Sequence, residues 1–305
     1  MKYSFLITLA FVVCSVVSAQ QTPQYSQYMY NMSTVNPGYV FDQSDVISTG
    51  LLYRKQWVNI DGSPSSANVF LNFPVGEKIE LTLNYVNDQI GDAIAIKNDY
   101  VNVDFAYKTQ LSRSLHLAYG LKLGIDSFRV NSLGSNVSDD PAFGETTSEL
   151  QLNIGAGAFL YADNFYLGIS SPNLLPNEAE LGSIGVSENS LHLFGIVGYV
   201  YEISDVVTLK PSAVVKQVVG APISFDISAN TLLYNRFEAG VSYRYQESIS
   251  ALAGFRITPD LRIGYAYDFG INDLNNLSTG SHEIMLLFDF DLLKTSKNYS
   301  SPRFY

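Results

Sequence analysis

The sequence has very little cysteine, and the position of that residue excludes most cysteine chemistry. Cys14 is the only cysteine among 305 residues, and it lies in an apolar run over residues 5–17. This run follows Lys2 and is followed by the small residues Ser18 and Ala19, so residues 1–19 are predicted to be a signal peptide that is cleaved before Gln20. The exported chain would contain no cysteine, which excludes a disulfide framework and thiolate catalysis.

Other scarcities narrow the class of protein further. After residue 19, no apolar run reaches the roughly 18 to 20 residues that a membrane-spanning helix needs. Lysine and arginine number 18 against 29 aspartate and glutamate residues, and the net charge of −11 argues against a nucleic-acid partner. By contrast, 21 tyrosines and 18 phenylalanines favour β-strands.

Apolar side chains alternate with polar or small ones along most of the chain. Between Leu115 and Ile125 every odd position is apolar, and the even positions are His, Ala, Gly or Lys. About fourteen such segments follow one another and predict an all-β protein. Their approximate spans are 47–58, 65–74, 78–87, 98–110, 114–128, 149–161, 164–172, 190–202, 205–217, 222–233, 235–245, 248–257, 260–269 and 281–292.

Three features favour a transmembrane antiparallel outer-membrane β-barrel of about 14 strands over a soluble double-sheet protein. Strands with six alternating apolar residues, tilted near 40°, span about 26 Å, close to the ~25 Å apolar band of such barrels. Closure of the sheet into a barrel pairs the backbone groups of every strand edge, which is required because hydrocarbon offers them no hydrogen-bond partner. Short turns alternate with longer polar loops near residues 88–97, 130–148, 173–189 and 270–280. We therefore assign residues 47–293 to a barrel in the cell outer membrane and residues 294–305 to a C-terminal tail.

If the apolar side chains face lipid, the alternate side chains face the lumen and carry charges of both signs. Such charges most simply form a space-filling, hydrogen-bonded network rather than a ligand site. Glycines on the same face, such as Gly120 and Gly157, leave room for another segment to approach the wall. The candidate lumen charges are Asp104, Lys122, Asp126, Glu238, Arg244, Arg256, Arg262, Asp268 and Asp289.

Residues 20–46 precede the first predicted strand and have neither the helical nor the strand period. One interpretation is a plug inside the lumen, with its tyrosines over the inner glycines and its amides bonded to lumen charges. The alternative is a segment that covers the periplasmic rim or serves as a docking arm. The sequence leaves both open. The candidate contact residues are Tyr25, Tyr28, Tyr30, Asn36, Pro37 and Tyr39.

Signals for catalysis or metal binding are weak. His116, His192 and His282 lie on three separate predicted strands and form no ligand motif. No Gly-x-Ser-x-Gly nucleophile elbow is present, and the Gly-Ala-Gly-Ala run at 155–158 continues a strand rather than forming a phosphate loop. We expect no enzyme activity, no catalytic residue, no cofactor and no metal site.

Several short segments, in order along the chain, resemble the PorP/SprF family of outer-membrane proteins, which is associated in Bacteroidetes with type IX secretion and gliding motility. Gly38 departs from the family, which usually has alanine there. The segments are 24–31 (QYSQYMYN), 36–39 (NPGY), 53–57 (YRKQW), 61–64 (DGSP), 87–91 (NDQIG), 209–212 (LKPS), 264–268 (GYAYD), 280–284 (GSHEI) and 301–305 (SPRFY).

The resemblance implies a non-enzymatic barrel that works with the secretion machinery. Its partners would be machinery components and a secreted cargo such as a large surface adhesin, which it helps to deliver or anchor. The family transfers no catalytic residues. The residues themselves leave two other functions open, namely a porin-like channel for small solutes and a barrel lipid hydrolase with a reactive serine near a histidine.

Overall fold

The computed structural model describes residues 23–92, 94–132, 147–175, 177–181, 184–189, 191–219 and 221–291. The predicted signal peptide and C-terminal tail lie outside these residues, as does most of the predicted loop 130–148. No helix in the described part of the chain is long and apolar enough to cross a membrane.

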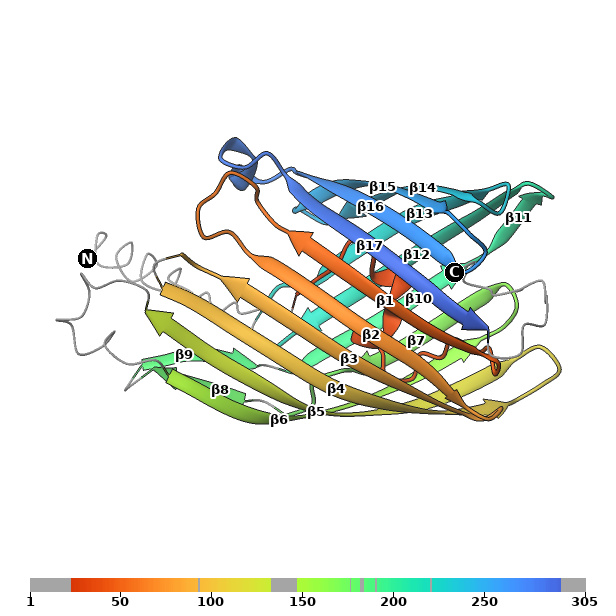
Figure 1. The fold of residues 1–305 in the computed structure, drawn as a ribbon, viewed down its shortest axis with the longest axis horizontal. Coiled ribbons are helices and arrows are strands. Elements are labelled where there is room, and N and C mark those ends of the chain that lie inside the picture. The colour runs from red at the N-terminus through yellow and green to blue at the C-terminus, as the bar shows by residue number, and fades with distance from the viewer. Residues whose placement is uncertain are drawn as a thin grey trace, which may run out of the picture.

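Antiparallel strands make up most of the described chain (Figure 1). Three short 3-10 turns accompany them: η1 (Tyr28–Tyr30), η2 (Met32–Thr34) and η3 (Asp273–Asn276). The strands are β1 (Val46–Lys55), β2 (Ser65–Val75), β3 (Ile79–Ile90), β4 (Ile94–Gln110), β5 (His116–Ser132), β6 (Thr147–Tyr161), β7 (Phe165–Ser171), β8 (Asn177–Leu181), β9 (Ile184–Asn189), β10 (His192–Tyr199), β11 (Tyr201–Ser204), β12 (Val207–Val218), β13 (Ser224–Leu233), β14 (Phe237–Arg244), β15 (Ser248–Arg256), β16 (Leu261–Gly270) and β17 (Ser281–Asp291).

The main sheet closes on itself, because the first and last strands pair. The β1–β17 ladder runs from Val46 opposite Asp291 to Lys55 opposite His282. Around the rest of the sheet, strands pair antiparallel with the next strand of that sheet, and β10 and β11 both pair with β12. Since β10 and β11 are two parts of one strand, the barrel has 14 strands, which confirms the predicted fold class.

The interruption between β10 and β11 has a local cause on the neighbouring strand. The β10–β12 ladder ends with Gly198 opposite Ser212, and the β11–β12 ladder begins with Tyr201 opposite Leu209. Pro211 therefore lies opposite the break, and proline has no N–H to donate to a ladder.

One predicted loop contains regular structure. Within the span 173–189, β8 and β9 form a separate two-stranded antiparallel sheet. The sequence predicts a long polar connection there but not these two strands, because a hairpin outside the barrel pairs its own backbone groups and needs no apolar alternation against lipid.

The two faces of the barrel wall differ sharply in exposure. On β5 the side chains of Leu121 and Leu123 are 63% and 59% exposed, whereas Lys122 between them is 4% exposed. The same alternation recurs on other strands, so that apolar side chains cover the outside, and polar side chains line the lumen together with a smaller set of buried apolar ones. This arrangement fits a wall between hydrocarbon and a polar interior.

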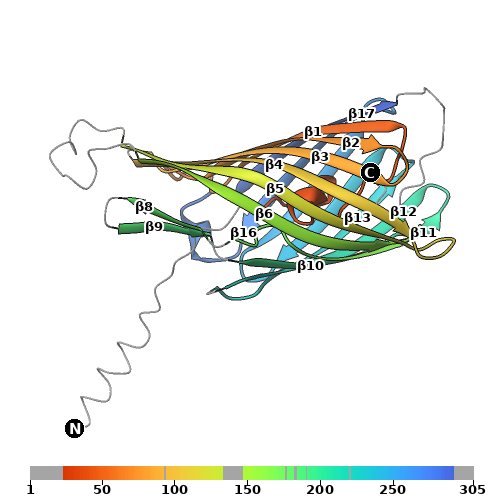
Figure 2. The same cartoon turned by 90° about the horizontal axis from the view of Figure 1, so that it is seen from below.

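The two rims of the barrel differ as well. Turns such as 76–78 and 205–206 are short at one rim, where β1 begins and β17 ends. At the other rim, β4, β5 and β6 reach beyond their neighbours toward the β8–β9 hairpin (Figure 2). These strands contain 17, 17 and 15 residues, well above the roughly 9–11 that span a membrane. We place the rim with the short turns in the periplasm and the extended ends of β4, β5 and β6 outside the cell.

Candidate functional site

The N-terminal segment lies inside the barrel lumen (Figures 1 and 2). Its backbone makes turns rather than a helix or strand, and the Asn36 side chain accepts a hydrogen bond from the Gly38 N–H at 2.8 Å. Such an Asn-Pro-Gly turn reverses the chain without needing a regular backbone ladder. Met32 and Ser33, in the second 3-10 turn, are fully buried. We refer to residues 23–45 as the lumen segment.

Two carboxylates and one arginine of the wall hold the beginning of the lumen segment. Glu283 accepts hydrogen bonds from the backbone N–H groups of Ser26 and Gln27, both at 2.9 Å. The Ser26 hydroxyl donates to Asp268 at 2.8 Å. Arg54 pairs with both Asp268 and Glu283, so all three charged groups are bonded although they are nearly fully buried.

Amide side chains of the adjoining part of the wall hold the middle of the lumen segment. Asn31 donates to the side-chain oxygens of Asn68 on β2 and Asn84 on β3, at 2.7 and 2.9 Å. Asn84 in turn donates to the Ser33 hydroxyl at 2.9 Å. Lys122 on β5 reaches the Ser33 carbonyl at 3.3 Å. The backbone and side chains of this part of the segment, which has no regular ladder, thus find hydrogen-bond partners on β2, β3 and β5.

Inner glycines provide the space for the Asn-Pro-Gly turn. A Cβ at Gly120 would lie 2.0 Å from the Pro37 carbonyl oxygen, and one at Gly157 would lie 2.0 Å from Asn36 Oδ1. Real Cβ atoms do not approach so closely, so side chains at these positions are incompatible with the turn where it lies. The expectation that tyrosines would cover the glycines was wrong at these two positions, where the turn does so.

The end of the lumen segment returns to the periplasmic rim. Glu80, near the start of β3, accepts hydrogen bonds from the backbone N–H groups of Phe41 and Asp42 at 2.6 and 3.2 Å. The Asp42 carboxylate pairs with Lys108 at 3.0 Å. The chain then enters β1 at the rim where that strand begins.

The tyrosines of the lumen segment combine apolar packing with hydroxyl hydrogen bonds. Tyr28 bonds to Ser212 at 3.1 Å, and Tyr30 donates to Glu238. Tyr39 packs edge-to-face on Phe159, with ring centroids 5.6 Å apart. Burial raises the pKa of both Tyr28 and Tyr30, and for Tyr30 the Glu238 carboxylate raises the pKa further. Both phenols therefore stay neutral and can act as hydrogen-bond donors.

The candidate lumen charges all belong to inward-facing positions and form several separate groups. Lys122 pairs with Asp104 at 3.4 Å, and Arg262 pairs with Glu238 at 3.7 Å. Arg244 binds Asp226, another inward-facing carboxylate, at 3.1 Å. Of the other four candidates, Asp268 pairs with Arg54 as described above, and Asp126, Arg256 and Asp289 are buried or half-buried side chains of the same wall. Their role as a functional site remains a prediction.

Sequence reasoning missed two residues that contact the lumen segment directly. Arg54 and Glu283 were not among the candidate charges, although each has inward parity on its strand. They are 229 positions apart in the sequence, and the pairing of β1 with β17 brings them together. Two sequence features could have identified both residues: their inward parity, and their position in the family-like segments 53–57 and 280–284.

The three histidines lie apart on the barrel wall. His116 stacks on Tyr161, and His282 contacts Tyr265 on the outside of the barrel. His192 is buried and stacks on Phe194. Among the described residues, no group of three or more histidine, cysteine or acidic side chains has the arrangement of a metal site.

A closed antiparallel barrel with an apolar exterior and a polar lumen defines an outer-membrane β-barrel protein. Residues 17–288 match the family model described as the type IX secretion system membrane protein PorP/SprF, and the chain belongs to this family. The resemblance from short segments is thereby confirmed, as is the location in the outer membrane. Membership also implies association with the type IX secretion machinery.

Solved structures with a similar fold are outer-membrane channels and transporters. CymD, a monoaromatic hydrocarbon channel, has 12% identity and a TM-score of 0.50, over 87% of this chain and 92% of that chain. A Pseudomonas aeruginosa FadL homologue has 13% identity and a TM-score of 0.52, over 90% and 96%. The P. putida toluene transporter TodX has 10% identity and a TM-score of 0.51, over 86% and 94%. These identities indicate a shared fold alone. No curated protein matches the chain.

Proposed function

We propose that this protein is a non-enzymatic accessory barrel that helps the type IX secretion system to deliver or anchor partner proteins, such as large adhesins, at the cell surface. Residues 20–46 act as its plug. In this mechanism the barrel recognises cargo and machinery through its rims, and its lumen does not let solutes pass through. Family membership supports the secretion role.

The observation that carries this proposal is the way the lumen segment is held. Ser26, Asn31 and Phe41 each bond to the wall, through carboxylates on β17 and β3 and amides on β2 and β3. Because these hydrogen bonds are spread along the segment, its release from the lumen would break all of them. Each broken bond would leave a buried polar group without a partner, so release is unfavourable. A permanently filled lumen suits a docking protein better than a diffusion pore.

The outer rim supplies a surface on which cargo could dock. Strands β4–β6 extend past the spanning length, and the β8–β9 hairpin stands beside them (Figure 2). A raised wall of this kind adds contact area outside the membrane without enlarging the barrel. We propose that secreted partners bind there and that machinery components bind at the periplasmic rim.

A gene deletion with complementation tests the secretion role. We expect the deletion strain to lack specific surface or secreted proteins, and the intact gene to restore them. Complementation with a variant in which residues 177–189 are replaced by a short glycine-serine linker should restore barrel insertion without restoring those proteins. An unchanged set of exported proteins in the deletion strain would refute the accessory role.

A channel for small solutes is the second candidate. The names of the structural neighbours CymD and TodX favour it, since those proteins are described as a hydrocarbon channel and a toluene transporter. Conductance in planar bilayers separates the two functions. We expect low conductance from the intact chain and a large increase after deletion of residues 20–46, whereas a channel would conduct before the deletion.

A further inference from the structure

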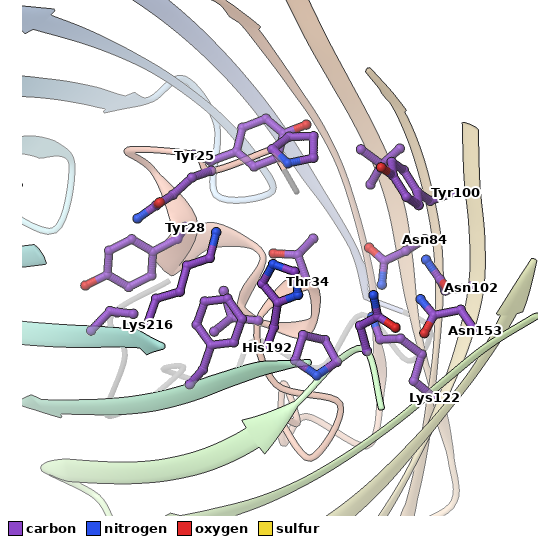
Figure 3. Close-up of a pocket in the computed structure, with 18 of the residues that line it drawn as sticks. Tyr25, Tyr28, Thr34, Asn84, Tyr100, Asn102, Lys122, Asn153, His192 and Lys216 are labelled. Atoms are coloured by element: carbon purple, nitrogen blue, oxygen red, sulfur yellow. The ribbon is translucent and has the colours of Figure 1, made fainter. Parts of the chain in front are cut away.

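A cavity of about 100 Å³ lies in the lumen between the lumen segment and the barrel wall (Figure 3). Tyr25 and Tyr28 of the lumen segment line it, and Phe194 and Val214 add apolar surface from the wall. A single water needs only about 10–15 Å³ of such volume, so the cavity has room for a small organic molecule. Its lining also includes charged side chains from two different parts of the wall.

Two lysines line the cavity, and Lys122 is paired with Asp104, so Lys216 on β12 is the lysine that is open to a ligand charge. It is 3% exposed, and its amine points into the cavity (Figure 3). Asp226 lines the same cavity, but Arg244 binds both of its carboxylate oxygens at 3.1 Å, and Gln24 donates to it at 3.2 Å. Among the described residues, no carboxylate forms an ion pair with Lys216. A buried ammonium without a carboxylate partner favours an anionic ligand.

The wall formed by β5 and β6 offers acceptors instead. Asp126 is 5% exposed, and its Oδ1 atom has no hydrogen-bond partner among the described residues. The nearby Lys122 forms its ion pair with Asp104, at 3.4 Å. Asn153 Oδ1 also lacks a donor in the described structure. Buried acceptors of this kind favour a ligand with a hydroxyl or amino donor.

We propose that this cavity binds a small amphipathic carboxylate whose far end carries a hydrogen-bond donor. The carboxylate pairs with Lys216, the aromatic or short aliphatic body packs between Tyr25, Tyr28 and Phe194, and the donor faces Asp126 and Asn153. Burial of both polar ends makes recognition depend on charge and length rather than on hydrophobicity alone. The site is independent of the secretion role.

Calorimetric titration of the purified full-length protein in detergent tests the site with two probes. The first, 4-hydroxyphenylacetate, has the ring, the carboxylate and the distal hydroxyl. The second, 4-methylphenol, keeps the ring and hydroxyl but lacks the carboxylate. We expect tighter binding of the first probe by about 10-fold to 100-fold, because a charge-assisted hydrogen bond changes an equilibrium constant by that factor.

Three variants identify the residue responsible. Lys216→Met should remove the preference for the carboxylate, and Lys216→Arg should retain most of it. Lys97→Met makes the same charge change on β4, away from the cavity lining, and should leave the preference intact. Heat-modifiable migration on gels confirms folding of each variant. Equal affinity for the two probes in the unmodified protein, or an unchanged preference in folded Lys216→Met, would overturn the proposal, since both indicate only partition into apolar space or detergent.

Discussion

The packing of the lumen segment against Gly120 leads to a quantitative prediction for the variant Gly120→Ala. The added Cβ would lie 2.0 Å from the Pro37 carbonyl oxygen and 2.2 Å from the Gly38 nitrogen. Since Cβ atoms essentially never come within 3.0 Å of such atoms, the turn must move by about 1 Å. Both clashing atoms are backbone, so no side-chain rotation relieves the overlap.

The expected cost follows from the known effect of overpacking. Adding one methyl group to a well-packed interior destabilises it by about 1–3 kcal/mol. Here the cost applies to the seated segment, because the β5 strand keeps its ladder partners when the segment leaves. The population with the segment released should therefore rise about 5-fold to 150-fold.

Thiol labelling measures that population directly. Ser33 belongs to the lumen segment and is fully buried while the segment is seated. The variant Ser33→Cys should therefore react with a bulky maleimide only after the segment leaves the wall. The predicted absence of cysteine from the mature chain provides a clean background. We expect the labelling rate to rise by the same factor in Gly120→Ala, provided that the segment reseats faster than the reagent reacts.

Gly195→Ala is the matched control, because a Cβ at Gly195 on β10 meets no atom within 4 Å. Its labelling rate should equal that of the parent Ser33→Cys protein. If Gly120→Ala also leaves the rate unchanged while the barrel stays folded, the segment does not pack against β5 as described, and the reasoning fails.

Two further substitutions test the lumen network and the lipid-facing surface. Arg54→Met should destabilise the protein by about 3–5 kcal/mol in guanidinium titrations, because it leaves the buried carboxylates of Asp268 and Glu283 without their cation. The control Arg129→Met removes an exposed ion pair and should cost below about 1 kcal/mol. Equal effects of the two substitutions would contradict this account. Leu123→Arg places a charge on the exterior of β5 and should cost up to about 2–4 kcal/mol in folding into lipid vesicles, unless that face does not meet hydrocarbon.

The strand layout was predictable because period-two alternation is a local property. The span 235–245, for example, contains β14 at Phe237–Arg244, and the span 205–217 nearly coincides with β12 at Val207–Val218. The β8–β9 hairpin was missed because it forms a separate two-stranded sheet and is not part of the barrel wall, so the barrel pattern does not apply to it.

The charges of the lumen illustrate a different limit. Parity along a strand correctly assigns Lys122 and Asp268 to the inner face, since neighbouring side chains alternate between faces. Parity does not show that Lys122 pairs with Asp104, or that Asp268 meets Arg54 from the far end of the chain. Those partners depend on the register of adjoining strands, and a shift of one residue would place different side chains opposite each other.

The amino-acid sequence alone established the class of this protein, because alternation, the absence of helical spans and the order of its short segments are all properties of the linear chain. The position of residues 23–45 required the closed barrel. Tyr30, Asn36 and Ser26 reach partners on strands that are more than 100 residues away along the chain. Only closure of β1 on β17 creates the enclosed space in which those partners face the segment together.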